Sequence, residues 1–418
     1  MPCETTLRNL EPAIYRLFAY CEANHWAGYD PYDALNSRIF EALPFLNSRL
    51  PRLALIQAFK RSPINLRPIS LVPKTQNPKA IALFLASLIK LIRAGQECDQ
   101  RLLQYFVDRL VAMRSPSPYW CWGYSFPWQT RTKLVPRNTP NLVCTTFVAD
   151  ALLDAYELSN DERHLNMAVS AARYLVNDLY WFDGSTATFC YPLPSIRSRV
   201  HNANFLAAAL LCRIAKHTGE MAFVKPALET ARYSASRQLE DGSWYYGEEA
   251  SQRWIDNFHT GYNLCALQTI ADCGITEEFS ASARRGFQFY RRHFIEPNGA
   301  VRYFHDREYP VDIHCVAQSI ITLINLKHLS EDSIAIAESI FRWAMENMWN
   351  GDGFFYYKKF RAHTIRTSYM RWSQAWMLLA MSVLLNDARS RRDTPLEAPT
   401  SPVPTMGEIL VPGCGVSQ

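Results

Sequence analysis

Two kinds of hydrophobic segment alternate along the chain. In the first kind, apolar residues recur at three- and four-residue spacing and leave one face polar, which is typical of a helix at the protein surface. These segments are 162–177, 222–238, 278–294 and 333–348. The second kind is apolar on nearly every side, which predicts helices buried between an outer layer and a central space. These segments are 145–157, 203–215, 259–271, 313–324 and 371–385.

Aromatic turns that contain glycine separate the segments at a nearly constant interval. Their glycines are 54 to 61 residues apart and are Gly123, Gly184, Gly242, Gly299 and Gly353. Asp-Gly and Asn-Gly pairs suit tight turns because glycine adopts positive φ without steric cost. Self-similarity with a period of this length is the mark of a repeat protein. We therefore predict an all-α fold, an α/α toroid of about six to seven helical hairpins joined by short aromatic turns.

The same pattern is looser toward the N-terminus. Residues 79–93 resemble a buried helix and 99–113 an outer one, 7–23 is amphipathic, and 31–43 is predicted to be a short inner helix. From Asp387 onward the chain is rich in Arg, Pro, Ser and Thr, a composition that buries little apolar surface. We expect a single toroid domain over residues 1–386 and a disordered tail over 387–418.

Composition and charge exclude several classes of function. The net charge of +5 is small and no run of five like charges occurs, so no nucleic-acid partner is predicted. The longest apolar stretch, 80–92, is too short to span a bilayer and contains Lys90. No basic segment followed by an apolar core opens the chain, and the eleven cysteines are dispersed singly, which favours free thiols in a reducing compartment. We predict a cytoplasmic protein without a transmembrane segment.

Residues that can do chemistry are concentrated in the loops that enter the buried helices. In a toroid these loops open onto one end, so residues from successive repeats would surround one carbohydrate-sized cleft. The alternative for Asn141, Asp256 and Asp312 is helix capping, but His, Arg and Tyr are poor capping residues. The candidates are Asp30, Trp122, Trp128, Asn141, His201, Asn202, Trp254, Asp256, His259, Tyr262, Asp312, His314, Tyr369, Arg371 and Trp372.

The aromatic content favours a sugar as the ligand. Aromatic residues make up 13% of the chain, and tryptophan and tyrosine rings stack on sugar rings while Asn, Asp and Arg bind the hydroxyl groups. The possible metal ligands are His259, Asp312, His314 and Cys315. No H-x-x-x-H or paired C-x-x-C motif accompanies them, so no metal is predicted. Without a phosphate-binding loop, a dinucleotide fingerprint or a nucleophile elbow, no cofactor is predicted either.

Two resemblances to known families add to this interpretation. The segments QLEDGSW (238–244) and DNFHTGYNL (256–264) resemble turns of triterpene cyclases and protein prenyltransferases, whose zinc-binding histidine would correspond to His259. The chain lacks the D-x-D-D motif and the D-x-C pair of those enzymes, so this resemblance supports the toroid and not their chemistry. The segments GYDPYDALNS (28–37) and WIDNFHTGYNL (254–264) resemble toroid proteins of bacterial polysaccharide and capsule biosynthesis, over roughly residues 24–386.

The second family is broadly similar to six-hairpin glycosidases and to uronate epimerases and lyases. The resemblance implies a poly- or oligosaccharide substrate and peripheral association with a polysaccharide synthesis complex. An epimerase or lyase removes the C5 proton of a uronic sugar with His or Tyr and neutralises the sugar carboxylate with Arg, Asn or His. A retaining or inverting glycosidase needs two carboxyl groups instead, for which Asp256 and Asp312 form the best pair.

The loops hold more His, Asn, Tyr and Arg than acids, so acid–base chemistry on a uronic sugar is the first hypothesis. A glycoside hydrolase, a non-catalytic glycan-binding subunit and an isoprenoid-binding toroid remain as alternatives. The predicted catalytic residues are Asp256, His259, Asp312, His314 and Tyr369. The predicted substrate-binding residues are Arg371, Asn141, His201, Asn202, Trp254, Tyr262, Trp372, Trp122, Trp128 and Asp30.

Overall fold

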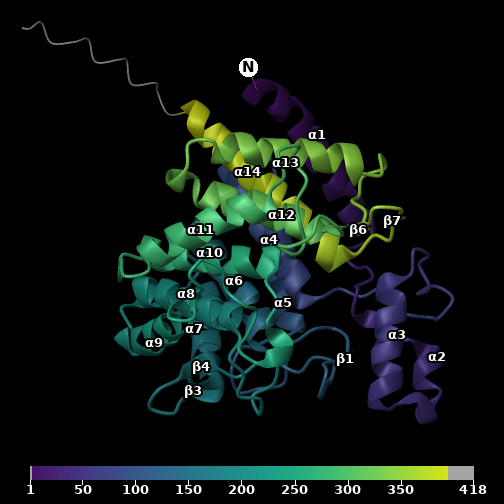
Figure 1. Ribbon diagram of the computed structural model, residues 1–418, viewed down its shortest axis with the longest axis horizontal. Coiled ribbons are helices and arrows are strands. Elements are labelled where there is room, and N and C mark those ends of the chain that lie inside the picture. Colours follow the sequence, from purple (N-terminus) through teal and green to yellow (C-terminus); the bar gives the residue numbers. More distant parts are fainter. Residues whose placement is uncertain (1, 394–418) are drawn as a thin grey trace, which may run out of the picture.

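Six long helices stand side by side around the centre of the molecule (Figure 1). The computed structural model describes residues 2–393, and the inner helices of this part are α4 (Pro78–Arg93), α6 (Leu142–Ser159), α8 (His201–Thr218), α10 (Asn257–Asp272), α12 (Ile313–Asn325) and α14 (Trp376–Asp393). Each packs on the next along the chain, and α14 packs on α4. The inner helices therefore form a closed ring.

Each inner helix carries one outer helix. Five of the outer helices follow their partners in the sequence and are α5 (Gln100–Ala112), α7 (Glu162–Tyr174), α9 (Val224–Ala235), α11 (Ser280–Phe294) and α13 (Ser333–Asn347). The sixth is α1 (Pro2–Ala23), which packs on α14. This arrangement confirms the predicted α/α toroid, and the described residues form six hairpins.

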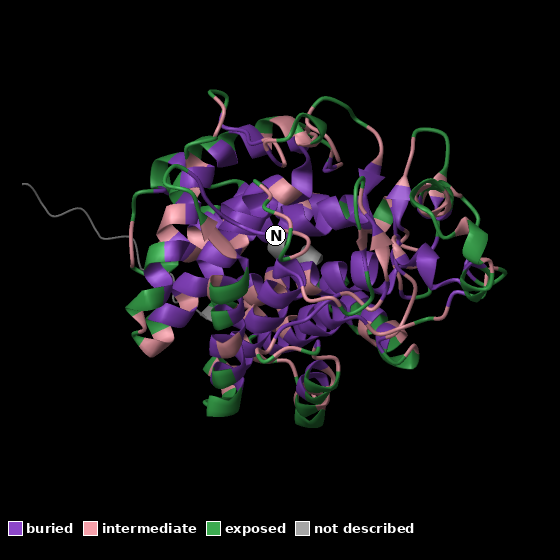
Figure 2. Cartoon of the chain, turned by 90° about the horizontal axis from the view of Figure 1, so that it is seen from below, coloured by how far each residue is buried: buried purple, intermediate pink, exposed green. Residues whose placement is uncertain are grey.

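Burial follows the two kinds of segment. Leu210 of α8 is fully buried, whereas Glu162 and Arg163 of α7 are exposed. Figure 2 shows the same separation, with buried residues in the middle of the chain and exposed ones toward its outside. The prediction that the segments apolar on nearly every side line the centre, and the amphipathic ones face solvent, is confirmed. No helix in residues 2–393 is long and apolar enough to cross a membrane.

The loops between hairpins contain short antiparallel strands and single helical turns. The strands are β1 (Trp128–Gln129) with β2 (Leu134–Val135), β3 (Tyr180–Phe182) with β4 (Ala187–Phe189), and a three-stranded sheet of β5 (Val311–Asp312), β6 (Lys358–Lys359) and β7 (Thr364–Ile365). The turns are η3 (Leu175–Leu179), η4 (Met221–Phe223), η5 (Ala250–Gln252), η6 (Lys327–Leu329) and η7 (Met370–Ala375). The last of them leads directly into α14.

The segment predicted as a short inner helix is instead part of a protruding module. It contains η1 (Asp33–Asn36), α2 (Arg38–Glu41), η2 (Pro44–Leu46) and α3 (Arg49–Arg61). Residues 29–74, called the insert below, begin and end at reciprocal 3.1 Å hydrogen bonds between Gly28 and Thr75. The insert buries a small core of its own, formed by Ala34, Leu35, Phe40, Ile56, Phe59 and Val72. With its apolar residues in this core, residues 31–43 cannot also serve the toroid core, so the prediction was wrong.

The C-terminal boundary is also later than predicted. Helix α14 continues to Asp393, and Asp387, where the tail was expected to start, is buried and pairs with Lys327 and Arg391. Residues 387–393 are therefore helical and not part of a tail. The rest of the predicted tail, 394–418, lies outside the described residues.

The repeat glycines give a test of how the turns fit the outer helices. Gly242 and Gly184 have nearly the same φ, +91° and +93°, but a Cβ on Gly242 would lie 2.5 Å from the Arg285 carbonyl oxygen, whereas one on Gly184 meets nothing within 4 Å. Both Gly→Ala variants strain the backbone, by about 1–3 kcal/mol. We expect Gly242→Ala to lower the free energy of unfolding further because α11 must also move. Urea denaturation checks this, and equal losses for the two variants would contradict it.

Candidate active site

The inner helices all begin at the same end of the toroid, and side-chain caps position the first residues of α6, α10 and α12. Asn141 accepts a 2.9 Å hydrogen bond from the Cys144 amide, Asp256 one of 3.0 Å from His259, and Asp312 one of 3.0 Å from His314. The capping role considered for these three residues is therefore present. Because the caps fix the helix starts, they also fix the direction of the neighbouring side chains.

Three of the predicted residues converge on Phe258 of α10. Its ring centroid lies 4.1 Å from that of His259, 4.7 Å from His314 and 5.6 Å from Trp372. These residues come from three successive repeats, so the helix starts do bring distant parts of the chain together. Tyr262, one turn further along α10, contacts His314 Nε2 through its hydroxyl at 2.7 Å.

His259 is held by Asp256 in a defined orientation. Its Nδ1 lies 2.7 Å from Asp256 Oδ2, which also accepts a 2.8 Å hydrogen bond from Trp254 Nε1. A carboxylate accepts but cannot donate, so the proton of neutral His259 lies on Nδ1 and the lone pair on Nε2. The His259 side chain is 21% exposed and that of Asp256 only 1%. The pair therefore combines a partly exposed imidazole with a carboxylate that is kept inside.

His314 has a different environment. Its ring is buried between Phe258 and Trp376, at centroid distances of 4.7 and 4.5 Å. Burial, together with the positive charges of Lys79 and Arg371, holds the pKa of His314 well below its usual value. The ring is therefore neutral at physiological pH and serves as the hydrogen-bond partner of Tyr262.

Two of the candidate carboxylates are engaged in internal ion pairs. Asp30 accepts hydrogen bonds from Arg371 Nε at 2.6 Å and from Arg371 Nη2 at 2.8 Å. These two predicted substrate-binding residues therefore bind each other. Asp312, fully buried, accepts a 3.0 Å hydrogen bond from Trp372 Nε1 and pairs with Lys358 Nζ at 3.0 Å. Arg371 keeps only Nη1 outside its pair with Asp30.

Other candidates lie in the packed interior. Tyr369 is fully buried and accepts a 2.8 Å hydrogen bond from Arg67, and Trp122, also fully buried, donates to the Leu110 carbonyl at 2.8 Å. Both contacts stabilise the fold and leave no face for a substrate. His201 is buried beside Ser234. Burial lowers the pKa of His201 to about 4. Trp128 of β1 packs its ring against Tyr124. Asn202 lines a small enclosed pocket together with Asp256 and His259.

The sequence interpretation missed a group of tyrosines, called the tyrosine ring below. Its members are partly exposed, and they lie close enough together that a negative charge on one hydroxyl raises the pKa of another. They are Tyr32, Tyr124, Tyr191, Tyr246 and Tyr303. Burial raises the pKa of Tyr246 and Tyr303 well above the usual value, so both hydroxyls stay protonated donors. Tyr246 and Tyr303 each follow a repeat glycine by four residues, a signal that could have found them.

Lys79 was missed as well. Its side chain is buried at the start of α4, with Nζ 3.8 Å from the ring centroid of Phe147 and 5.4 Å from that of Tyr262. Among the described residues no carboxylate lies within ion-pair distance of this nitrogen. Burial and the charge of Arg371 lower the pKa of Lys79 well below its usual value. A charged residue in an otherwise apolar helix was the signal available in the sequence.

The expected carbohydrate-sized cavity opens at the opposite mouth of the toroid. It has a volume of about 670 Å³, and its lining runs from Phe147, Tyr262 and Trp376 inside the ring to residues at the C-terminal ends of inner helices such as Asp272 and Asn325. At the helix-start end the insert brings Asp30 against Arg371 and places Tyr32 among the other members of the tyrosine ring. The pocket beside His259 at that end is small and enclosed.

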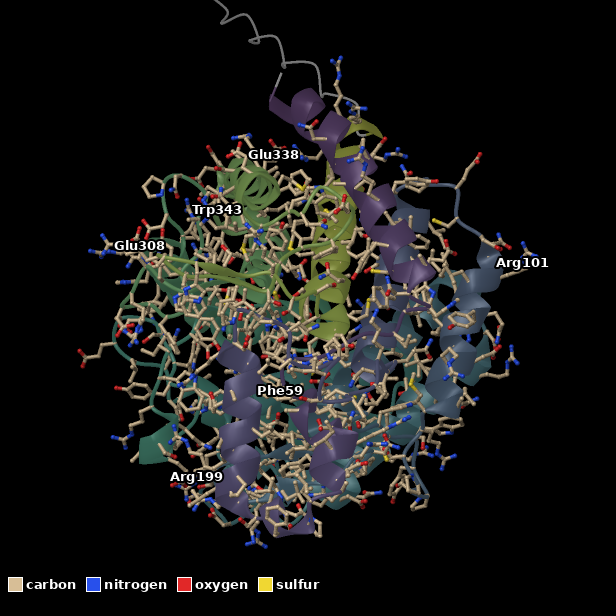
Figure 3. All side chains as sticks on the ribbon, turned by 90° about the vertical axis from the view of Figure 1, so that its right-hand side faces the viewer. Phe59, Arg101, Arg199, Glu308, Glu338 and Trp343 are labelled. Carbon is tan, nitrogen blue, oxygen red and sulfur yellow. The ribbon has the colours of Figure 1, made fainter. Side chains whose placement is uncertain are left out.

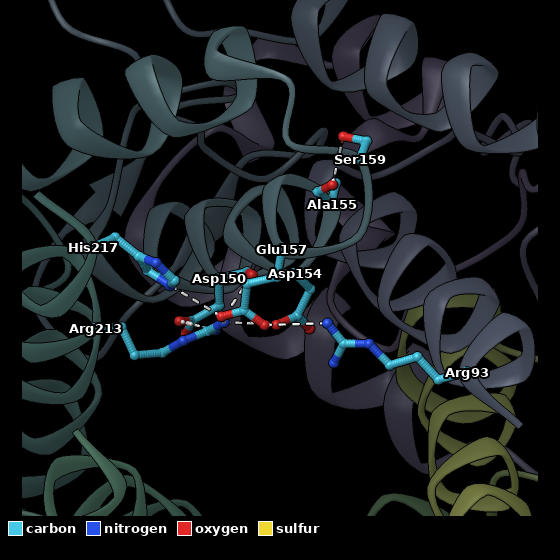
Figure 4. A network of polar contacts seen from close by, with 8 residues as sticks. All are labelled: Arg93, Asp150, Asp154, Ala155, Glu157, Ser159, Arg213 and His217. Atoms are coloured by element: carbon cyan, nitrogen blue, oxygen red, sulfur yellow. Dashed lines mark hydrogen bonds and ion pairs between the residues drawn. The ribbon is translucent and has the colours of Figure 1, made fainter. Parts of the chain in front are cut away.

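A network around Arg213 lines the larger cavity (Figure 4). Arg213 binds Asp150 at 3.0 Å, Asp154 at 2.7 Å and Glu157 at 2.9 Å. Burial raises the pKa of Asp150 to about 6. For Glu157 burial acts in the same direction, but Arg213, Arg93 and His217 outweigh it and hold the pKa at about 2. Asp150 and Glu157 thus belong to one network but differ widely in pKa.

Asp150 leads to a prediction about pH and stability. Because its pKa rises from 3.8 to about 6 on folding, the folded state binds the proton more tightly, and stability falls as pH rises from about 4 to about 6. Asp150→Asn removes this fall. The free energy of unfolding of the variant relative to the parent should therefore rise by about 1–2 kcal/mol across that window. Urea unfolding at stepped pH measures it, and a pH-independent difference would refute the prediction.

Comparison with known proteins places the fold. No protein-family model matches the sequence, and no curated protein sequence matches it. The structure is similar to a GH76 α-mannanase from Bacteroides thetaiotaomicron (11% identity, 77% of this chain, 89% of that one, TM-score 0.57). It is also similar to cellobiose 2-epimerase from Bacillus thermoamylovorans (10% identity, 74% of this chain, 87% of that one, TM-score 0.56). A D-mannose isomerase is similar to the same degree (10% identity, 74% of this chain, 86% of that one, TM-score 0.57). The chain shares their toroid fold. At such low identity the likeness extends to the fold of the toroid and not to its chemistry.

Proposed function

We propose that the toroid is an enzyme of polysaccharide biosynthesis or modification that performs acid–base chemistry, as an epimerase or lyase, on a uronic-acid-containing glycan. The observation that carries this proposal is the Asp256–His259 pair, 2.7 Å apart, in which Nδ1 of the partly exposed His259 binds the carboxylate and Nε2 is left for a substrate. Its place in polysaccharide biosynthesis rests on the resemblance of residues 28–37 and 254–264 described above.

In this reaction His259 Nε2 takes the C5 proton of the uronic sugar. Asp256 stabilises the imidazolium that forms, because its buried carboxylate already accepts the Nδ1 proton. A protonated hydroxyl of the tyrosine ring then donates a proton, either to C5 from the opposite face in an epimerase or to the departing O4 in a lyase. Tyr246 suits this role because its ring centroid lies 4.5 Å from that of His259.

Basic groups at this end favour an anionic sugar. In the described part of the chain Lys79 has no carboxylate partner, and its Nζ lies 5.4 Å from the Tyr262 ring centroid, which is 6.1 Å from that of His259. A sugar carboxylate placed between them would raise the lowered pKa of Lys79 again. The protonated amine and Nη1 of Arg371 would then neutralise the carboxylate, which makes the neighbouring C5–H more acidic. The same end suits a glycosidase less well, because Asp30 and Asp312 are each bound by a cation and an additional N–H donor and neither is set up as an acid.

The test is deuterium incorporation at C5. Oligosaccharides of glucuronate, galacturonate or mannuronate are incubated with the protein in deuterium oxide and followed by NMR, with ultraviolet absorbance reporting a C4–C5 double bond. We expect one of these substrates to gain C5 deuterium if the enzyme is an epimerase, or to give a rise in absorbance if it is a lyase, whose product carries no hydrogen at C5. The matched control is the same oligosaccharide with its carboxyl groups reduced to alcohols, which should show neither change. Absence of both exchange and absorbance in all three uronates would refute the proposal.

A second candidate function is glycoside hydrolysis at the opposite mouth. It is favoured by one observation, which is that three carboxyl groups, those of Asp150, Asp154 and Glu157, line the 670 Å³ cavity. All three bind Arg213, but burial still raises the pKa of Asp150 to about 6, whereas that of Glu157 is about 2. A glycosidase needs one protonated and one ionised carboxyl group. New reducing ends without C5 exchange, lost in Asp150→Asn and retained in His259→Gln, would select this function over the first.

A further inference from the structure

The insert exposes an unusual amount of apolar surface. Of the ten large hydrophobic side chains that are well exposed in the described part of the chain, six lie between residues 39 and 71. They are Ile39, Phe45, Leu50, Ile64, Ile69 and Leu71, and four of them are more than 70% exposed. Single exposed apolar residues are common, but a group of this size in one small module marks an interaction surface.

Helix α3 shows how this surface is arranged. Leu50, Ala54, Ala58 and Arg61 are exposed at helical spacing, while Ile56 and Phe59 on the other side are buried in the core of the insert. The outward side of α3 thus carries Leu50, two alanines and Gln57, with a cation at its C-terminal end. Figure 3 faces the side of the molecule on which α3 lies and labels Phe59.

Between residues 38 and 71 the insert holds one acidic residue, the exposed Glu41, which pairs with Arg137 at 3.8 Å. No Asp or Glu occurs from Ala42 to Gln96, although the chain has 39 acids in 418 residues. A second acid-free stretch, from Arg109 to Ala149, includes the β1–β2 hairpin. The two stretches are in contact, since Arg49 donates to the Arg131 carbonyl at 2.5 Å and Arg52 to Gln129 at 3.1 Å.

The cations of this surface lack the carboxylate partners that several arginines have elsewhere in the chain. Arg213, Arg232 and Arg307 each pair with an acid of the same chain. Within residues 42–74 of the described chain, only the buried Arg67 does so, with Asp33. Arg49, Arg52, Lys60 and Arg61 carry positive charge that no neighbouring carboxylate compensates.

We propose that the insert surface, residues 38–71 with the β1–β2 hairpin, docks on an anionic lipid membrane. Exposed cations attract anionic headgroups, and apolar side chains between them enter the boundary between headgroups and acyl chains. A polyanionic glycan would satisfy the cations but would gain little from Leu50, Ile64 and Ile69, because sugars stack on aromatic rings and not on aliphatic chains. The inference stands on this surface alone and does not depend on the proposed reaction.

Docking there would bring the candidate active site to the membrane. The insert that carries the exposed residues also carries Asp30, which holds Arg371, and Tyr32 of the tyrosine ring. A membrane bound to the outer side of the insert therefore lies next to the helix-start end of the toroid and away from the Arg213 network. This geometry fits a glycan that is attached to lipid.

The experiment is co-sedimentation of the full chain with vesicles. We expect binding to vesicles of phosphatidylglycerol and phosphatidylcholine in equal amounts, and weak binding to phosphatidylcholine alone. The triple variant Phe45→Ser, Leu50→Ser, Ile69→Ser and the double variant Arg49→Gln, Arg61→Gln should each lower the partition coefficient at least about tenfold. The matched controls Met221→Ser and Arg361→Gln change exposed residues outside the insert and should bind as the parent does.

Several results would overturn the proposal. They are absence of binding to the anionic vesicles, equal binding by the triple variant and its Met221→Ser control, or binding to soluble polygalacturonate that competes fully with vesicles and is unaffected by the triple variant. The last result would assign the surface to a glycan. Light scattering that shows a dimer broken by the triple variant would assign it to a second copy of the chain. Circular dichroism of every variant shows whether the fold is retained.

Discussion

Replacing His259 with glutamine is expected to lower the rate of C5 deuterium exchange by a factor of about 10²–10⁴, the usual contribution of a general base. Glutamine keeps the approximate size of the ring but has no basic nitrogen. The effect should fall on kcat more than on KM, because proton removal occurs in the transition state and not on binding. Exchange rates are measured by NMR on the uronate that the parent protein turns over.

Two further variants decide how that result is interpreted. Asp256→Asn should lower the rate less than His259→Gln and shift its pH profile, because Asp256 acts through His259. His363→Gln, which changes an exposed histidine, should leave the rate unchanged. Full activity of a correctly folded His259→Gln protein would remove His259 from the mechanism.

Replacing Arg67 with methionine is expected to lower the free energy of unfolding by about 3–5 kcal/mol, because it leaves a buried carboxylate without its cation. Arg67 is fully buried and binds Asp33 at 2.6 Å, the Tyr369 hydroxyl at 2.8 Å and the Asp30 carbonyl at 2.7 Å. These contacts join the insert to the loop before α14. Urea unfolding followed by circular dichroism measures the loss.

The partner of Arg67 provides the control. If the loss comes from the uncompensated carboxylate, adding Asp33→Leu to Arg67→Met should restore part of the stability. Arg101→Met, which changes a surface arginine whose side chain is 93% exposed, should have no measurable effect. A double variant that is less stable than Arg67→Met alone would show that packing, and not charge, explains the loss.

The toroid could be predicted from the sequence because its information is local and repeated. Each hairpin is marked in the sequence by a glycine turn and by the contrast between an amphipathic and an apolar helix. A wrongly assigned helix in one repeat is therefore corrected by comparison with the other repeats. The insert has neither signal. Its residues 31–43 contain apolar positions that could belong to either core, and only the complete structure shows that Phe40 packs on Phe59 and not on α4.

The candidate site was predictable to the extent that helix starts determine it. His259, His314 and Trp372 occupy equivalent places in successive repeats, and they meet around Phe258. The pairing of Arg371 with Asp30 spans 341 residues, and no local pattern indicates it. Whether these residues carry catalysis stays a prediction for the variants above.

The pairing of α1 with α14 has a consequence for synthesis of the chain. Glu11 on α1 binds Arg389 on α14, 378 residues away, and Tyr20 binds Ser368, 348 residues away. Helix α1 is thus synthesised long before its partner α14. The apolar side of α1 stays uncovered while the other hairpins form, and the ring closes only after α14 has been made, with the entropy cost of a very long loop. We expect nascent chains that stop before Trp376 to expose α1 to proteases and chaperones.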